Sequence, residues 1–172
     1  MKEQSLLIKT PRLALRPFSL SDAEDMYALN ADPEVVKYTG DDPFESIEAA
    51  RKFINAYDAY KKYGYGRWTL LFEGKYAGWC GLNFNPENKE TDLGFRLLKK
   101  YWNLGIGTEA ATACVDYGFK DLGVTKIIGR AMEENTGSIR ILQKIGMSFE
   151  KEFEAHGGRC VQYAIWKYRT ES

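Results

Sequence analysis

Three consecutive strands in the middle of the chain constrain its fold most strongly. Residues 67–72, 76–84 and 91–98 are rich in aromatic and aliphatic residues, and only the short segments 73–75 and 85–89 separate them. These segments contain the Gly, Asn and Pro that are typical of turns. Because strands joined by such short turns pair antiparallel, the centre of the chain is predicted to be an antiparallel meander.

Helices and further strands are predicted on both sides of this meander. Before it, a strand at 12–18 is followed by a helix that begins with a capping box of Ser21 and Glu24, and by a helix at 45–62. After it, the pattern predicts helices at 107–122 and 136–145, a strand at 125–131, and a hairpin of the strands 149–154 and 159–168.

The order of these elements indicates the fold class. Strand and helix do not alternate uniformly, as a barrel or a doubly wound sheet would require. The order favours an α+β fold with one sheet that carries both strand directions. No repeat or linker marks a boundary, so residues 1–172 are expected to form a single domain.

The charges of the chain balance. Lys plus Arg and Asp plus Glu each total 24, so no net field attracts nucleic acid or a membrane surface, and neither partner is expected. No stretch approaches the roughly 20 apolar residues that cross a bilayer, and residues 1–10 lack the features of a signal peptide. We therefore expect a cytoplasmic protein.

Residue types that bind metals are sparse. Cys80, Cys114 and Cys160 are widely spaced without a CxxC pair, and we expect them to be reduced and buried. The single histidine, His156, lies beside two glycines in a predicted hairpin tip, where we expect it to be exposed. No metal site is expected.

A glycine-containing segment at 102–108 leads from the meander into the next helix. Backbone amides at a helix N-terminus are not used by the helix, and the helix dipole favours an anion there. Gly105 and Gly107 allow phosphate oxygens to approach the main chain closely. The segment is interpreted as a phosphate-binding cradle, with an ordinary strand-to-helix turn as the alternative.

Two other nucleotide-binding patterns do not fit. Residues 105–110 match G-x-G-x-x-A, but residues 99–103 separate the first glycine from the strand, and residues 126–130 hold no acidic residue at a strand end. The Gly-Lys-Ser/Thr ending of a P-loop is also absent. A nucleotide-binding oxidoreductase is therefore disfavoured.

The cradle is part of a longer pattern. Residues 92–110, from Asp92 to Ala110, resemble the acetyl-coenzyme A motif of the GNAT N-acetyltransferase superfamily. Further blocks resemble the RimJ/RimL branch, the ribosomal-protein-alanine acetyltransferases: residues 10–18, Asp22 and 32–36 resemble its start, and 135–138 with 144–147 its second cofactor motif. The blocks occur in family order and cover nearly the whole chain.

The resemblance implies a GNAT-like fold, in which a single mixed, mostly antiparallel sheet is splayed at the cofactor site and carries helices on both faces. It implies acetyl-coenzyme A as the acetyl donor, with the cradle amides on its diphosphate and a strand edge on its pantetheine. The Gln or Arg that often opens the cradle is Trp102 here. The cofactor-binding residues implied are Phe95, Arg96, Leu97, Leu98, Asn103, Leu104, Gly105, Ile106, Gly107, Thr108, Asn135 and Ser138.

Two catalytic residues are implied in the same way. Ser138 can reach the thioester sulfur as a proton or hydrogen-bond donor, because the tyrosine that many relatives use is replaced by Leu142. Asp92 is the candidate base, where relatives often carry a carboxylate that faces the acceptor amine. An ordinary helix serine and a solvated strand-end charge are the alternatives. Asn135 is expected to cap its helix, and Glu150, Glu152 and Glu154 are weaker candidates for the base.

The expected activity is acetyl transfer to a primary amine, by direct attack in a ternary complex. The acceptor is a peptide or protein N-terminus or a small-molecule amine, and the sequence does not decide between them. Loops 37–44 and 61–67, with Tyr38, Tyr63 and Tyr65, are expected to border the acceptor groove. A non-catalytic acetyl-coenzyme A module or sensor is the main alternative, and the oligomeric state is open between monomer and homodimer.

Overall fold

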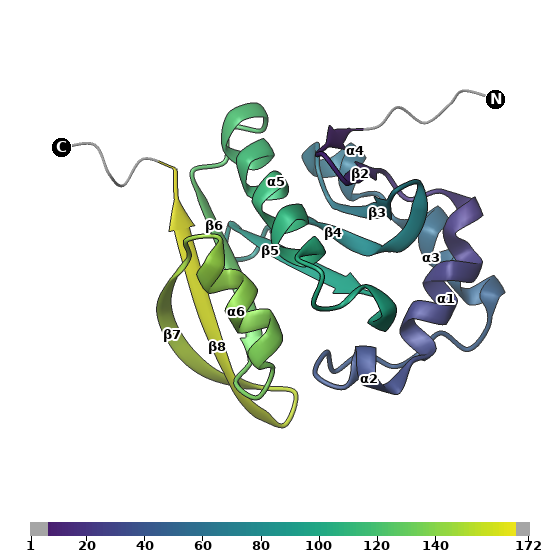
Figure 1. The fold of residues 1–172 in the computed structure, drawn as a ribbon. Helices are drawn as coiled ribbons and strands as arrows, with labels where there is room; N and C mark the ends of the chain where they lie inside the picture. Colours follow the sequence, from purple (N-terminus) through teal and green to yellow (C-terminus); the bar gives the residue numbers. More distant parts are fainter. Residues whose placement is uncertain (1–6, 168–172) are drawn as a thin grey trace.

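The structure is a computed structural model that describes residues 7–167. Within this range eight strands form one sheet in the order β1-β2-β3-β4-β5-β6-β8-β7 (Figure 1). The strands are β1 (Ile8–Lys9), β2 (Leu13–Arg16), β3 (Arg67–Phe72), β4 (Lys75–Asn85), β5 (Glu90–Leu97), β6 (Lys126–Met132), β7 (Ser148–Ala155) and β8 (Gly158–Trp166). All neighbouring strands are antiparallel except β5 and β6. The predicted meander and the mixed α+β sheet are confirmed.

Helices cover both faces of this sheet, as expected (Figure 1). They are α1 (Ala23–Ala31), α2 (Pro33–Val36), α3 (Ile47–Ala56), α4 (Ala59–Tyr63), α5 (Ile106–Asp121) and α6 (Thr136–Lys144), with the 3₁₀ helices η1 (Leu20–Asp22) and η2 (Lys99–Tyr101). Successive side chains of a strand face opposite sides. On β4, Cys80 and Leu82 therefore join the main core beneath α5, whereas Trp79 packs on the second core of α1 and α3.

The sheet opens between β5 and β6. Their parallel pairing is confined to Asp92 with Ile128 and Leu93 with Gly129. Beyond this point β5 continues along β4, and β6 continues along β8. The last residues of β5 therefore have no strand on one side.

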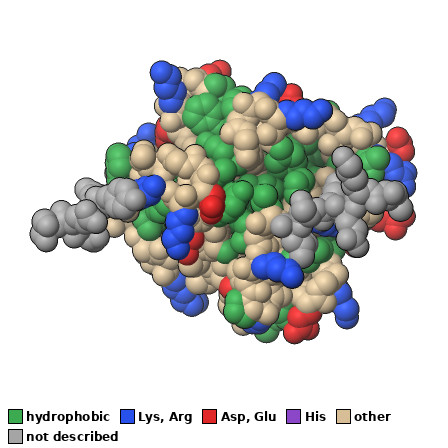
Figure 2. All heavy atoms as spheres, turned by 90° about the horizontal axis from the view of Figure 1, so that it is seen from above, with side chains coloured by type: hydrophobic (Ala, Val, Ile, Leu, Met, Phe, Trp, Pro, Cys, Tyr) green, Lys and Arg blue, Asp and Glu red, His purple; other side chains and the backbone are tan. Residues whose placement is uncertain are grey.

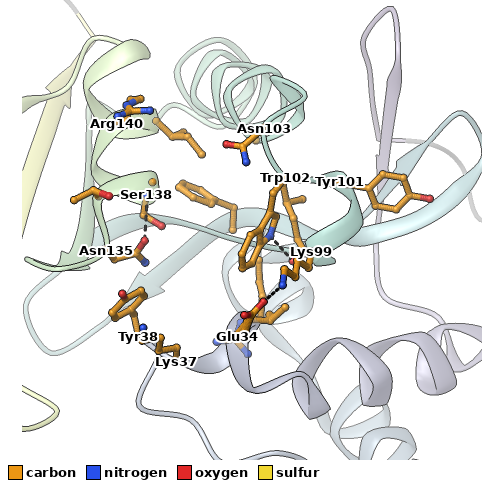
Figure 3. Close-up of a pocket in the computed structure, with 18 of the residues that line it drawn as sticks. Glu34, Lys37, Tyr38, Lys99, Tyr101, Trp102, Asn103, Asn135, Ser138 and Arg140 are labelled. Atoms are coloured by element: carbon orange, nitrogen blue, oxygen red, sulfur yellow. Dashed lines mark hydrogen bonds and ion pairs between the residues drawn. The ribbon is translucent and has the colours of Figure 1, made fainter.

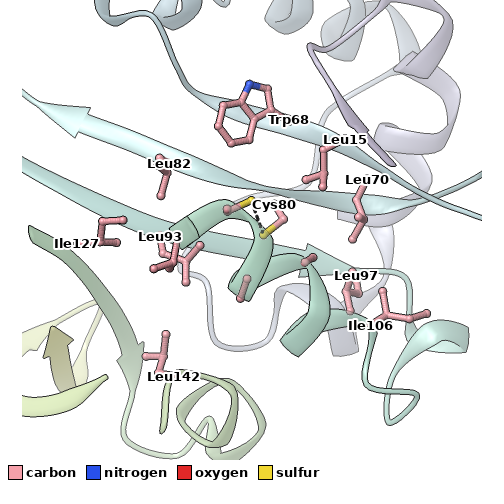
Figure 4. Close-up of a cluster of buried hydrophobic side chains, with 14 of the residues drawn as sticks. Leu15, Trp68, Leu70, Cys80, Leu82, Leu93, Leu97, Ile106, Ile127 and Leu142 are labelled. Carbon is pink, nitrogen blue, oxygen red and sulfur yellow. Dashed lines mark hydrogen bonds between the residues drawn. The ribbon is translucent and has the colours of Figure 1, made fainter. Parts of the chain in front are cut away.

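Helix α5 packs closely on the sheet beside this opening. Its buried face carries the small residues Ala110, Ala111, Cys114 and Gly118. A Cβ on Gly118 would lie 2.9 Å from Leu82 Cδ1, which shows how closely the helix approaches β4. Leu82, Leu93 and Ile127 surround it (Figure 4), and full burial of each such side chain contributes about 1.5–3 kcal/mol. The packing fixes where α5 begins.

The three cysteines are buried and free, as predicted. Cys80 and Cys114 form a close pair between β4 and α5, with their Sγ atoms 3.6 Å apart.

The structure differs from the prediction in the first third of the chain. The capping box is formed by Ser19 and Asp22, not by Ser21 and Glu24. Arg16 also binds Asp22, with two nitrogens at 2.8 and 2.9 Å. Thr69 of β3 also donates to this carboxylate, at 2.7 Å. The carboxylate therefore serves the cap and two strands, and these tertiary contacts decide where the helix begins.

The helix predicted at 45–62 is two helices, α3 and α4, because the backbone is extended at Tyr57. Tyr57 packs its ring on Phe18, and its hydroxyl accepts a hydrogen bond from the Arg67 amide at 2.7 Å. These tertiary contacts outweigh continuous helical periodicity. Strand β1 and helix α2 were not predicted, and the predicted end of the last strand at Tyr168 lies outside the described residues.

The face in Figure 2 carries Lys and Arg side chains interspersed with Asp and Glu, without a broad patch of either sign. Among residues 7–167, no helix is both long enough and apolar enough to span a membrane.

Candidate active site

A cavity of about 730 Å³ lies at the opening between β5 and β6. Four segments line it: residues 95–97 at the end of β5, residues 99–108 from η2 into α5, residues 134–144 of and before α6, and residues 34–39 around α2. Figure 3 shows Asn135, Ser138 and Arg140 on one wall, Trp102 and Asn103 on the facing wall, and Tyr38 below them. We call this cavity the cleft.

The predicted phosphate cradle forms one wall of the cleft. Asn103 and Gly105 both have left-handed backbone conformations, with φ of 63° and 77°. The hydrogen bonding of α5 begins with the Glu109 amide, which donates to the Gly105 carbonyl at 3.0 Å. The amides that precede Glu109 are therefore not used by the helix and can bind an anion.

The cradle residues differ in how they face the cleft. Asn103, Gly105, Gly107 and Thr108 line it. Ile106 is fully buried in the core, so only its backbone can contact a ligand. A Cβ on Gly107 would lie 2.8 Å from Ile141 Cδ1 of α6, so the two helices approach closely at this glycine. Leu104 is exposed and does not line the cleft.

The free edge of β5 forms the floor of the cleft. The Leu98 amide donates to the Ala77 carbonyl at 2.9 Å, so Leu98 faces β4. Because orientation alternates along a strand, Phe95 and Leu97 turn their N–H and C=O groups to the open side. The indole of Trp102 confirms this, since its Nε1 donates to the Leu97 carbonyl at 3.0 Å. Of the predicted residues 95–98, two thus present their backbone to the cleft.

Helix α6 forms the wall opposite the cradle. Asn135 is its N-cap, as predicted, and its side-chain oxygen accepts from the Ser138 amide at 3.2 Å (Figure 3). Both residues line the cleft, and no described residue hydrogen-bonds to the Ser138 hydroxyl. Leu142 is 1% exposed and packs on Gly129, so it belongs to the core. Thr136 and Ser138 are the hydroxyl residues of this helix that line the cleft, and Ser138 is the one that the sequence predicted.

Cationic side chains also line the cleft: Lys37, Arg96, Lys99, Arg140 and Lys144. Arg96 and the loop that begins at Lys37 were predicted, whereas sequence reasoning missed Lys99, Arg140 and Lys144. Lys99 binds Glu34 of α2 and so joins two walls; this hydrogen bond raises the pKa of Lys99. Arg140 and Lys144 are four residues apart on α6, a spacing that puts both on one face of a helix. This spacing, in the helix that Asn135 caps, is the sequence signal from which Arg140 and Lys144 could have been predicted to lie at the site.

Asp92 is not among the residues that line the cleft, and its side chain lies on the same face of β5 as Gly94, beside Arg67. Arg67 donates to Asp92 Oδ1 at 2.9 Å and to the Gly81 carbonyl at 2.9 Å. A Cβ on Gly94 would lie 2.6 Å from the guanidinium carbon of Arg67. The structure therefore places Asp92 in an ion pair just before the splay and does not bring it together with Ser138.

The other predicted side chains are placed as follows. Tyr38 lines the cleft. Tyr63 packs on Phe84, and Tyr65 is buried with its hydroxyl 2.8 Å from Thr91 Oγ1, so both have packing roles.

The β7–β8 turn also approaches the cleft region. His156 is exposed, as predicted, and its ring lies against Gly40 of the loop after α2, where a Cβ would be 2.5 Å from Nδ1. The hydrogen bond from Lys126 lowers the pKa of Glu150, which makes this carboxylate less suited to act as a base. Glu152 lies 3.9 Å from Arg159. Among the described residues, no group of three or more His, Cys, Asp or Glu could hold a metal.

The comparison with protein families identifies the chain. Residues 12–148 match the sequence model described as "Acetyltransferase (GNAT) domain". The chain belongs to the GNAT acetyltransferase family. This GNAT member is therefore an enzyme of the acyltransferase class.

Individual relatives agree with the family assignment. The uncharacterized N-acetyltransferase p20 of Bacillus licheniformis is 33% identical over 161 residues, which cover 88% of this GNAT chain and 89% of that protein. A GNAT-family acetyltransferase structure from Bacillus anthracis is 31% identical, with a TM-score of 0.81 over 93% of this chain and 98% of that one.

A third similarity concerns the fold alone. RimL, the ribosomal L7/L12 α-N-protein acetyltransferase in complex with coenzyme A, has a TM-score of 0.82 at 17% identity, over 94% of this chain and 98% of that one. The fold of the present chain is therefore shared with known GNAT structures.

Proposed function

We propose that this protein transfers an acetyl group from acetyl-coenzyme A to a primary amine, by direct attack in a ternary complex, and that it belongs to the RimJ/RimL branch. The observation that carries the proposal is that one cleft brings together an anion cradle, a free strand edge and an unpaired serine hydroxyl. Each of these features fits a different part of the donor.

The diphosphate fits the cradle. Helix α5 leaves the backbone amides at its start free of helical hydrogen bonds. The loop that leads to them contains Asn103 and Gly105, whose backbone is left-handed. Arg140 and Lys144 on the facing helix add positive charge to the same cleft. Backbone amides, a helix dipole and cations together favour a multiply charged anion.

Pantetheine fits the floor of the cleft. Its amide groups can pair with the backbone of Phe95 and Leu97, which faces the opening and has no strand partner there. The Leu97 carbonyl is already bound by Trp102, so we assign the Phe95 carbonyl and the two amides to this role. Asn135 holds the α6 end that faces this floor.

Acetyl-coenzyme A supplies an activated acyl carbon, whose bond to sulfur breaks as its bond to the amine nitrogen forms. Ser138 donates a hydrogen bond to the departing sulfur, or its proton, which water then replaces, because its hydroxyl is free and on the cleft wall. The excess proton of the amine goes to water, or through water to Asp92 Oδ2, the oxygen that Arg67 leaves open, because Asp92 itself does not line the cleft. Few of the proposed residues polarise the reacting bonds directly. Positioning of the two substrates therefore supplies most of the reduction in the activation barrier, about 7–11 kcal/mol at best.

The amine acceptor is placed at the end of the cleft near Tyr38. The loop after α2 and the β7–β8 turn meet there through Gly40 and His156. An α-amine has a pKa of about 8 and loses its proton more readily than a lysine amine.

Two measurements test the proposal on the purified chain. Calorimetry with acetyl-coenzyme A should show binding, and thiol release should accompany turnover in a panel of peptides, polyamines, amino acids and aminoglycosides. Absence of binding at millimolar donor contradicts the proposal outright. Binding without turnover of any amine supports a sensor instead.

A further inference from the structure

The start of the chain contacts the cradle, although almost a hundred residues separate them in the sequence. Arg12 Nε lies 2.8 Å from Glu109 Oε1, and Arg12 Nη1 donates to the Leu104 carbonyl at 2.9 Å. Thr10 Oγ1 donates to the second oxygen of Glu109. The proposed function gives no role to this group of contacts.

The bond to Leu104 fixes the direction of the next amide. In a trans peptide the C=O and the following N–H lie in one plane and point in opposite directions. The Leu104 carbonyl turns toward Arg12, so the Gly105 N–H must point away from Arg12. Gly105 lines the cleft whereas Arg12 does not. The Arg12 contact therefore directs a cradle amide toward the ligand.

The bond to Glu109 removes an electrostatic obstacle. Glu109 is the acidic residue in the first turn of α5, where its charge would oppose an anion bound to the cradle. Arg12 and Thr10 hold both of its oxygens, and the Arg12 charge compensates that of the carboxylate. One guanidinium thus orients the loop and neutralises its acidic neighbour.

We propose that Arg12 is a positioning residue for the diphosphate of the donor and acts through Leu104 and Glu109. This inference rests on the proposed function. Arg12 has no contact with the reacting atoms, and its effect should be limited to donors that carry the diphosphate.

Binding of coenzyme A gives the direct test. For Arg12→Ala, calorimetry should show coenzyme A binding weakened about tenfold, the loss expected when a charge-assisted hydrogen bond is removed. Arg12→Lys keeps the charge but cannot form both bonds of the guanidinium fork, so it should weaken binding by a smaller factor. Arg51→Ala is the matched control, because Arg51 pairs with Glu48 on the exposed surface of α3, and it should bind like wild type.

A truncated donor separates positioning from general damage. S-acetylpantetheine lacks the diphosphate, so its kcat/KM should be the same in Arg12→Ala and in wild type, while that of acetyl-coenzyme A falls. An equal loss with both donors means that Arg12 only supports the fold and overturns the inference. If Arg12→Ala does not fold, Arg12→Lys is judged by the same comparison.

The two levels of the proposal fail differently. A wild-type protein that does not bind coenzyme A removes the proposed function. A wild-type protein that binds it, together with Arg12 variants of unchanged affinity, removes only the role of Arg12.

Discussion

The side-chain oxygen of Asn135 accepts a hydrogen bond from the backbone amide of Ser138, at 3.2 Å. The cap therefore fixes the first turn of α6 and, with it, the direction in which the serine hydroxyl faces the cleft. The position of Ser138 is set by the helix cap and does not depend on a hydrogen bond from its own hydroxyl.

Ser138→Ala should lower kcat by about a hundredfold, the lower end of the range for proton transfer, with little change in the Kd of coenzyme A. The cap uses the backbone amide of residue 138, so the helix should remain intact. Steady-state kinetics with calorimetry measure both quantities. Ser148→Ala, at an exposed position of β7, is the control, and a Ser138 variant with wild-type kcat would exclude the hydroxyl from the mechanism.

Asn135→Ala should destabilise the protein by about 1 kcal/mol, because a helix cap is lost. Asn135→Ser restores a capping oxygen and should recover the stability. If the Asn135 amide also binds pantetheine, the serine variant should still bind coenzyme A less well than wild type. Urea unfolding and calorimetry on both variants distinguish these roles, and full recovery of affinity would leave the residue as a cap only.

Asp92→Asn tests the proposed base. The amide keeps an oxygen for Arg67, so the fold should be retained, while the acid limb of the pH–rate profile should disappear. Asp116→Asn is the control, because it makes the same change of charge on the exposed side of α5, and it should keep the wild-type profile. A wild-type profile in Asp92→Asn would assign the proton to water.

Gly94→Ala should displace the Arg67 guanidinium and destabilise the protein by about 1–3 kcal/mol, the usual cost of overpacking. The new Cβ would lie 2.6 Å from Arg67 Cζ, and three hydrogen bonds hold the guanidinium in place. Gly137→Ala is the contrast, because the nearest atom to its new Cβ is 4.0 Å away. In helix α6 this change should stabilise by up to about 1 kcal/mol. Equal melting temperatures for the two variants would contradict the packing around Arg67.

The stability of the protein should fall in acid partly through Glu109. Burial would raise the pKa of this carboxyl, but hydrogen bonds from Thr10 and Arg12 outweigh burial and lower it. As the pH falls, the Glu109 carboxylate of the unfolded state is therefore protonated first. Its contribution to the free energy of unfolding is present above the ordinary Glu pKa and is lost as the pH falls through the pKa of the folded state. Urea midpoints between about pH 6 and pH 3 should drop less in Glu109→Gln than in wild type. Parallel curves would show that the pairing does not affect folding.

The sequence predicted the sheet better than the first helices. The meander and the last hairpin follow local alternation and turn residues, so their strand ends are correct to within one residue, apart from the end predicted at Tyr168, which lies outside the described residues. The split at Tyr57 could not be predicted in this way, because it depends on Phe18 and the Arg67 amide, which are distant in the sequence.

The candidate site divides in the same manner. The cradle and the Asn135 cap are local patterns, and both could be predicted from neighbouring residues. The pairing of Arg12 with Glu109 and of Arg67 with Asp92 joins distant strands and helices, and residue spacing carries no sign of either.

Strand β8 lies between β6 and β7 in the sheet, although it follows both in the chain. During synthesis on the ribosome, β1 to β5 can therefore associate early, while one edge of β6 remains unpaired until β8 has been synthesised. The wall that carries α6 is completed only after β8 has emerged. A nascent chain should consequently acquire its sheet in two stages, and binding of the donor should appear only with the second.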